Sequence, residues 1–208
     1  MINIGSGLIP APFFNIYTMA QQAKIEDFSG TEVISLTEAK EYLRVDHAGD
    51  NDYITELIKI ARMQVVKDTN TAVVDLDVTE YFDKWPNNGI YQLRYSGKLG
   101  QTLSVKYYNP SNTLITLVED TDYRRIDYMG MPKIEMINTF TLKDRLNAIE
   151  IGYSVEPENS DETRTLKIAM YMLIQHYYDN RSPVSYLKVD EMPLGYKNII
   201  NQYKNYIW

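Results

Sequence analysis

Cysteine is absent from the 208-residue sequence, and histidine occurs only at His47 and His176. The first absence excludes a disulfide framework, a thiolate metal site and a cysteine nucleophile, and it suits a reducing compartment. The sequence has no run of about 18 apolar residues, so we expect no membrane-spanning helix. The N-terminal stretch lacks a basic region, and Pro10 and Pro12 interrupt it, so we expect no secretory signal.

Sequence motifs of common enzyme classes are also missing. The chain contains no GxSxG, HExxH, phosphate-loop or GxGxxG pattern, each of which would place a nucleophile, a metal or a phosphate in a defined geometry. The acidic pairs Asp161/Glu162 and Asp190/Glu191 fall at expected helix ends or loops, where solvated charge normally lies. We therefore expect a protein that is not an enzyme, with no catalytic residues and no cofactor.

The composition that is present is that of an acidic globular protein. Apolar residues make up 44% and charged residues 24% of the chain, and the formal net charge is −7. Proteins that grip nucleic acid usually carry a basic face, because phosphate contacts supply most of the affinity. This charge predicts weak binding of duplex DNA, although an acidic protein can surround DNA without holding it.

Four candidate ligands lie within seven residues, at Asp46, His47, Asp50 and Asp52. A calcium loop needs alternating oxygen ligands and a glycine at its sixth position. Counting from Asp46 puts an alanine at the third position, and counting from Asp50 puts Thr55 at the sixth, so both registers fail. A zinc site needs more than one histidine. We interpret Asp46–Asp52 as an acidic joint between two helices, with Asp50 and Asp52 capping the second helix, and we predict no metal site.

The spacing of apolar residues predicts an α+β fold that begins and ends with helices. The segment Ser35-Leu36-Thr37-Glu38 is a capping box, which opens a helix. Ser160 is an expected N-cap, and the helix after it is apolar on almost every face, which predicts that neighbours cover it all round. We expect this helix to pack on the helix 51–69, and on its other side to meet the sheet or another subunit. The predicted helices are 36–43, 51–69, 161–178 and 194–206.

The middle of the chain, about residues 73–155, has the pattern of an antiparallel β-rich insert. Short segments of alternating or β-branched and aromatic residues are separated by turn formers, with no helix between them, which favours a meander or small sandwich. The predicted strands are 79–82, 90–95, 103–108, 114–118, 133–136 and 148–153. We therefore divide the chain into an N-terminal arm, 1–33, and a domain, 34–208, whose helical core comprises 34–72 and 156–208.

Several apolar side chains are candidates for contacts between subunits. The arm is apolar but interrupted by glycine and proline, so we expect an extended segment that docks on a partner, with a short helical piece near Met19–Lys24. Tyr53 and Ile60 fall beside the core stripe of the helix 51–69, either at the periphery of the core or in a subunit contact. The predicted interface residues are Phe13, Phe14, Tyr17, Tyr53, Ile60, Tyr171 and Tyr178.

The order of these segments resembles the head–tail connector (adaptor) proteins of tailed bacteriophages. The stretch SLTEAKEYLRVDHAGDNDYITELIKIARMQVVKDTN is similar to the opening of that family. It is followed in order by VTEYFDKWP, LSVKYYN, DYRRI and HYYDNR, and then by a C-terminal helix. The resemblance covers about residues 35–206. The N-terminal 33 residues lie outside the pattern, and the insert of about 80 residues is large for the family.

The resemblance implies a structural protein of the virion neck, made in the host bacterial cytoplasm. It implies a homo-oligomeric ring, usually of 12 subunits, that lies beneath the portal protein and joins the next connector or tail protein. DNA passes through the lumen without specific binding. A neighbouring neck, stopper or tail-completion protein is the alternative role. A third reading is an enzyme or carbohydrate-binding module, with Trp85, Tyr91 and Tyr95 lining a groove; the alternative for these three rings is packing within the sheets.

Overall fold

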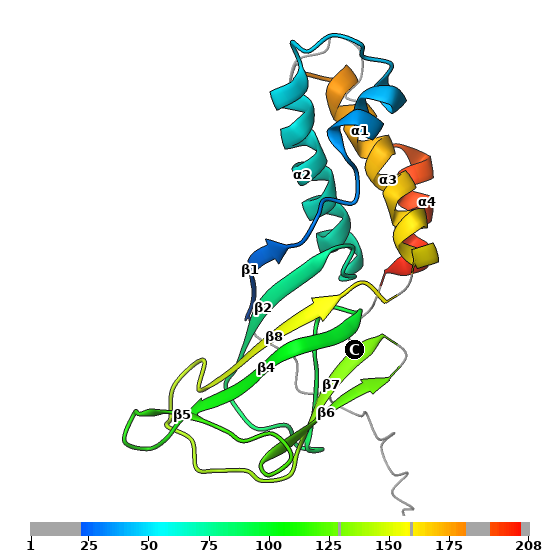
Figure 1. The fold of residues 1–208 in the computed structure, drawn as a ribbon. Helices are drawn as coiled ribbons and strands as arrows, with labels where there is room; N and C mark the ends of the chain where they lie inside the picture. The colour runs from blue at the N-terminus through cyan, green and yellow to red at the C-terminus, as the bar shows by residue number, and fades with distance from the viewer. Residues whose placement is uncertain (1–21, 129, 159, 182–191, 205–208) are drawn as a thin grey trace, which may run out of the picture.

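The computed structural model describes residues 22–128, 130–158, 160–181 and 192–204. Over these residues the chain forms four helices and two antiparallel sheets (Figure 1). The helices are bundled at one end of the molecule, and the strands extend from them to the other end. The predicted α+β class is confirmed. Within the described part of the chain, no helix is long and apolar enough to cross a membrane.

The helices begin and end close to the predicted residues. They are α1 (Leu36–Leu43), α2 (Asn51–Thr69), α3 (Ser160–Asp179) and α4 (Leu194–Tyr203). The predicted capping box is confirmed, because the Ser35 side chain accepts a hydrogen bond from the Glu38 amide while the Glu38 carboxylate accepts one from the Ser35 amide. α1 ends at Arg44, which adopts a left-handed backbone conformation with φ of 57°.

The helical layer is built on the contact between α2 and α3. The predicted core stripe of α2 is buried, and so is one face of α3, which confirms the pairing of these helices. The other side of α3 meets α4, not the sheet, and Ile168 on α3 is 47% exposed. The prediction that the sheet covers this side of α3 is therefore wrong, whereas its alternative, that another subunit covers it, stays a prediction. The buried residues of the pair include Ile54, Leu57, Ile58, Ala61, Val65, Leu166, Ala169, Met170, Leu173 and Ile174.

The strands form a five-stranded sheet in the order β1-β2-β8-β4-β5 and a three-stranded sheet in the order β3-β7-β6. Every ladder between these strands is antiparallel, as predicted for the β-rich segment. Strand β6 was not predicted, because its two central arginines break the apolar alternation. The strands are β1 (Gln22–Ser29), β2 (Asp75–Phe82), β3 (Ile90–Gln92), β4 (Lys98–Tyr108), β5 (Leu114–Thr116), β6 (Tyr123–Tyr128), β7 (Met131–Met136) and β8 (Ile149–Glu156).

Strand β1 corrects the description of the N-terminal arm. Its residues pair with β2 along the edge of the chain's own sheet, so the prediction that the arm docks on a partner is wrong for Gln22–Ser29. The helical piece expected near Met19–Lys24 is wrong for its described residues, 22–24. The free edge of β2 supplies the hydrogen bonds, and Ile25 and Phe28 pack against the core. Residues 1–21, which include the candidates Phe13, Phe14 and Tyr17, lie outside the described residues.

A buried carboxylate connects two strands of the five-stranded sheet to the segment that follows β3. Glu80 on β2 accepts hydrogen bonds from the Tyr153 hydroxyl at 2.5 Å and from the Arg94 amide at 2.7 Å. Its other oxygen, Oε2, is buried without a hydrogen-bond partner among the described residues. Burial raises the pKa of Glu80 above its ordinary value, although the hydrogen bonds oppose this. The Phe82 and Tyr91 rings, with centroids 4.3 Å apart, join β2 to β3 beside this carboxylate.

Truncating either leucine at the centre of the α2–α3 contact should destabilise the chain strongly. Leu57 and Leu173 are 4% and 0% exposed, and Leu→Ala changes at such sites cost roughly 2–5 kcal/mol in lost transfer free energy and cavity formation. Urea unfolding of Leu57→Ala and Leu173→Ala measures this cost. Ile168→Ala, on the exposed face of the same helix, is the control and should cost less than about 1 kcal/mol. Equal costs at Leu173 and Ile168 would contradict the packing.

The raised pKa of Glu80 makes stability depend on pH. The native state binds a proton more tightly than the unfolded chain, whose glutamate pKa is about 4.3. The free energy of unfolding should therefore fall as pH rises from about 4.3 through the raised pKa. Glu80→Gln removes this contribution, so its stability relative to the wild type should increase across the same interval, measured by urea unfolding between pH 4 and 8. Glu41→Gln, at an exposed position, should follow the wild-type curve; parallel curves for Glu80→Gln and the wild type would refute the prediction.

Candidate subunit interface

The outer face of α2 carries an exposed apolar stripe. Tyr53, Ile60 and Met63 are 36%, 46% and 53% exposed. With Glu56 and Lys67, which are also exposed, they recur at alternating steps of three and four residues, so they form one row along the helix. Tyr53 and Ile60 lie beside the core stripe as the sequence predicted. Met63 was missed, although its spacing of three from Ile60 carries the same signal.

A second exposed face lies across the bundle, on α1 and α3. The Tyr42 ring stacks on the Tyr171 ring, with centroids 4.7 Å apart and planes 20° apart. Tyr42 is 43% exposed and Ile168 is 47% exposed, whereas the predicted interface residue Tyr171 is half-buried beneath Tyr42. Each of α2 and α3 carries its exposed residues on the side away from the α2–α3 contact, because the side that faces the contact is buried. The two exposed faces therefore point away from each other, on helices that lie side by side in Figure 1.

An ion pair fastens α1 to α3 below the stacked rings. Lys167 Nζ lies 2.6 Å from Glu38 Oε1 and 5.9 Å from the centroid of the Tyr171 ring. The hydrogen bond from Lys167, followed by that from the Ser35 amide, lowers the pKa of Glu38 to about 2. Glu38 therefore caps its own helix and anchors it to α3 with the same carboxylate. The face that carries Tyr42 is thus fixed in position on the bundle.

A polar cluster at the start of α2 engages two of the predicted interface residues. Asp50 accepts hydrogen bonds from the Tyr178 hydroxyl at 2.5 Å and from Arg181 Nη2 at 2.7 Å. The Arg181 guanidinium lies over the rings of Tyr178 and Tyr53, 4.2 and 4.7 Å from their centroids. The Tyr53 hydroxyl donates to the Tyr177 carbonyl at 3.2 Å. These contacts join the end of α3 to the start of α2, so Tyr53 and Tyr178 are already bound within the chain.

Asp50 belongs to this cluster and does not cap α2 through its side chain. The residue stands at the N-cap of α2, but its side chain makes no capping hydrogen bond. The carboxylate turns to Arg181, whose hydrogen bond is the main reason that the pKa of Asp50 falls to about 2, and Tyr178 contributes next. The prediction that Asp50 caps the helix through its side chain is therefore wrong.

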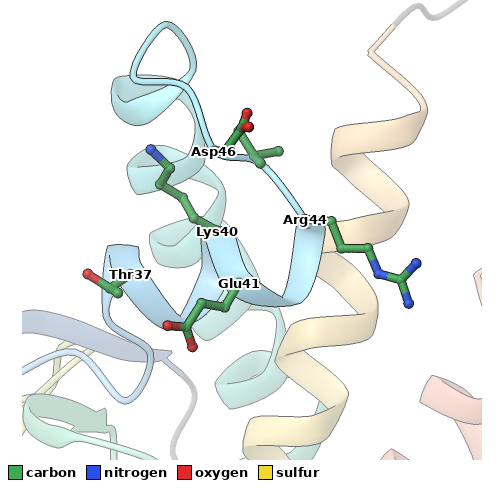
Figure 2. A pocket seen from close by; sticks show the side chains of 6 residues that line it. Thr37, Lys40, Glu41, Arg44 and Asp46 are labelled. Atoms are coloured by element: carbon green, nitrogen blue, oxygen red, sulfur yellow. The ribbon is translucent and has the colours of Figure 1, made fainter.

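Asp46, at the start of the acidic joint, borders an open hollow of about 570 Å³ beside α1. Figure 2 shows its side chains pointing in different directions, with Arg44 turned away from Lys40 and Glu41. Lys40 Nζ donates to the His47 carbonyl and to Asn51 Oδ1, at 2.7 and 2.9 Å. The Lys40 ammonium group therefore connects α1 to the acidic joint and to the start of α2. Among the described residues, no group of three His, Cys, Asp or Glu side chains could hold a metal ion.

The aromatic and histidine residues considered as candidate site residues do not form a site together. Tyr91 and Tyr95 are 0% and 8% exposed, and Trp85 packs against the core while its Nε1 donates to the Phe140 carbonyl at 2.6 Å. These rings pack within and between the sheets, so the sugar-groove alternative is wrong for them. His176 is half-buried, not buried as expected, and His47 is exposed at the joint.

The cluster at Asp50 should lose its stabilising effect in acid. A depressed native pKa contributes stability above the unfolded value of about 3.9, and that contribution is lost as pH falls through about 2. Asp50→Asn should therefore be less stable than the wild type at pH 7, and the gap should close toward pH 2, measured by thermal unfolding. Asp46→Asn, an exposed position in the same joint, is the matched control. A gap that stays constant with pH would contradict the assignment.

Comparison with known proteins identifies the fold. The sequence matches no protein-family model, and no curated protein is significantly similar to it. Solved structures share its fold: a chain in the neck of an empty gene transfer agent particle, computed with sixfold symmetry, has a TM-score of 0.68 at 13% identity, over 90% of this chain and 97% of that one. A chain in the virion of the native gene transfer agent particle gives 0.68 at 14% identity, over the same shares of both chains.

The neck of the native particle, computed with twelvefold symmetry, contains a further similar chain. Its TM-score is 0.61 at 15% identity, over 88% of this chain and 96% of that chain. The similarity extends over almost the whole length of both chains in all three comparisons, so it includes the helical bundle and the sheets. At these identities the comparisons establish the fold of this chain.

Proposed function

We propose that this chain is a structural subunit of the neck of a phage-like particle, and that copies of it form a ring between head and tail. The observation that carries the proposal is the fold shared with neck and virion chains over nearly the full length of both partners. The order of sequence segments that resembles head–tail connectors is an independent support. A structural role in the neck requires no catalytic residue.

A ring requires two different, complementary faces on each subunit, because a head-to-tail contact is repeated until it closes. The bundle offers two such faces on opposite sides, with exposed Ile60 and Met63 on α2 and exposed Tyr42 and Ile168 on α1 and α3. We infer that the α2 face of one subunit packs against the α1–α3 face of the next. Glu56 and Lys59 on the α2 face neutralise each other in an ion pair of 2.8 Å, which limits repulsion between two acidic subunits.

We further infer a ring of twelve beneath the portal protein, with DNA passing through its lumen. The twelvefold symmetry used for the neck of the native gene transfer agent particle supports this number. A net charge of −7 suits a conduit, because like charge on protein and phosphate prevents the DNA from adhering to the wall.

Electron microscopy of particles that carry this chain with an added affinity label tests the location. The label should decorate a ring at the head–tail junction. Label found on the capsid shell or at the tail tip, or particles that lack the chain, would contradict the proposal.

Paired charge substitutions test the ring contact in solution. Ile60→Asp and Ile168→Asp each bury a charge in one face only, so each should abolish the ring of the wild-type chain while leaving the monomer folded. Mixed together, the two variants retain one intact pair of faces and should form 1:1 dimers, measured by analytical ultracentrifugation. Leu114→Asp, at an exposed position on β5, is the control and should assemble as the wild type does. Rings from either single variant, or no dimers in the mixture, would refute the contact.

A further inference from the structure

The described chain begins beside a hollow at the end of the sheet far from the helices. Gln22 is the first residue of β1 and pairs with Tyr81, while the other end of β1 pairs with the start of β2 next to α2. The Gln22 side-chain oxygen accepts a hydrogen bond from Asn147 Nδ2 at 3.4 Å. The Asn147 amide in turn donates to Asp83 Oδ1 at 2.6 Å. Residues 1–21 are therefore joined to the domain at this point.

The hollow next to Asn147 has a volume of about 550 Å³. Leu142 and Leu146 line it together with five charged residues, Asp83, Lys84, Lys143, Asp144 and Arg145. Leu146 is 73% exposed. The following residue, Asn147, has a left-handed backbone with φ of 54°, a conformation that asparagine tolerates better than most residues. This turn presents an apolar side chain to solvent at the rim where β1 begins.

Two of the five charged side chains around the hollow, Lys143 and Arg145, have partners at a neighbouring turn. The Arg145 guanidinium lies over the Tyr108 ring, 4.0 Å from its centroid, and reaches Asn112 Oδ1 at 3.4 Å. Lys143 Nζ reaches the Pro110 carbonyl at 3.5 Å. Both side chains direct their charged ends to the turn between β4 and β5, so their aliphatic stems extend the apolar surface of the two leucines. The leucines and these stems therefore give the hollow an apolar part that an apolar side chain can cover.

The segment that enters the domain at this point has that chemistry. Residues 1–21 contain no charged side chain, although 24% of the whole sequence is charged. Their large apolar residues include Leu8, Ile9, Phe13, Phe14, Ile16 and Tyr17. Tyr17 is five positions from Gln22 and Phe13 is nine, which corresponds to at most about 18 and 32 Å of extended chain. Because Gln22 contacts Asn147, next to Leu146, chain of either length is long enough to return to the hollow.

We propose that the hollow at Leu142 and Leu146 binds the segment Phe13–Tyr17 of the same chain, which folds back from Gln22. The tether raises the effective concentration of the segment at the hollow far above that of a second copy. Docking covers Leu146 and removes the aromatic side chains from water. This inference concerns the strand end of the molecule and is independent of the proposed ring.

Crosslinking tests the proposal directly, because the natural sequence has no cysteine. Asn15→Cys combined with Lys84→Cys places one thiol in the segment and one at the rim, and a short bismaleimide joins them if the segment is docked. We expect efficient crosslinking within the monomer, seen by intact mass and gel mobility. The control pair, Asn15→Cys with Lys24→Cys, is also within reach along the chain but has its second thiol on β1, and should crosslink less. Equal or greater crosslinking of the control, or a ladder of covalent dimers from a neighbour's segment, would overturn the proposal.

Proteolysis gives an independent measurement on the full chain. Chymotrypsin cleaves after the aromatic residues of the segment, and a docked segment is cleaved only from its open state. Leu146→Asp should increase the cleavage rate at Phe13, Phe14 and Tyr17 by about tenfold or more, which is the factor expected for losing the burial of one leucine. Leu114→Asp is the control on a neighbouring exposed leucine and should leave the rate unchanged. Equal rates in the wild type and Leu146→Asp would overturn the proposal.

Discussion

The packing of α2 on α3 is the contact on which the other parts of the molecule depend. These helices are separated by about 90 residues, yet β2 follows α2 and β8 precedes α3, and β2 and β8 are neighbours in the five-stranded sheet. Pairing the helices therefore aligns the strands, and pairing the strands brings the helices together. Burial of the leucine, isoleucine and methionine side chains between α2 and α3 supplies the hydrophobic part of this coupling.

The same contact determines which surfaces remain for assembly. Once one face of each helix is buried, helical periodicity turns Tyr53, Ile60 and Met63 outward on α2 and Ile168 outward on α3. α1 covers one flank of α3, held by the Glu38–Lys167 ion pair, and α4 covers another. Two exposed apolar faces are left on opposite sides of the bundle. A subunit with opposite apolar faces has the geometry that a closed head-to-tail assembly requires.

Two carboxylates in this chain connect elements that are distant in the sequence. Asp50 links the start of α2 to the end of α3 through Tyr178 and Arg181. Glu80 on β2 links β8, through Tyr153, to the segment that follows β3, through Arg94. Their surroundings shift the two carboxyl pKa values in opposite directions. Asp50 is held ionised by a guanidinium near the surface, whereas burial of Glu80 disfavours its charged form. As pH rises, the contribution of Asp50 to the free energy of unfolding therefore increases, whereas that of Glu80 decreases.

The sequence by itself determined the helices, the antiparallel character of the middle segment and the core stripe of α2, because local spacing, capping residues and turn formers encode these features. It also marked Tyr53 and Ile60 as lying off that stripe. Only the tertiary structure decided that Gln22–Ser29 joins the sheet, since strand pairing depends on a free edge some 50 residues away along the chain. Tertiary structure likewise decided that Asp50 binds Arg181 and Tyr178 about 130 residues further on, and that Tyr91 and Tyr95 are interior. Local spacing indicates whether a segment forms a helix or a strand. The partner of an acidic or aromatic side chain depends on contacts between residues that are distant in the sequence.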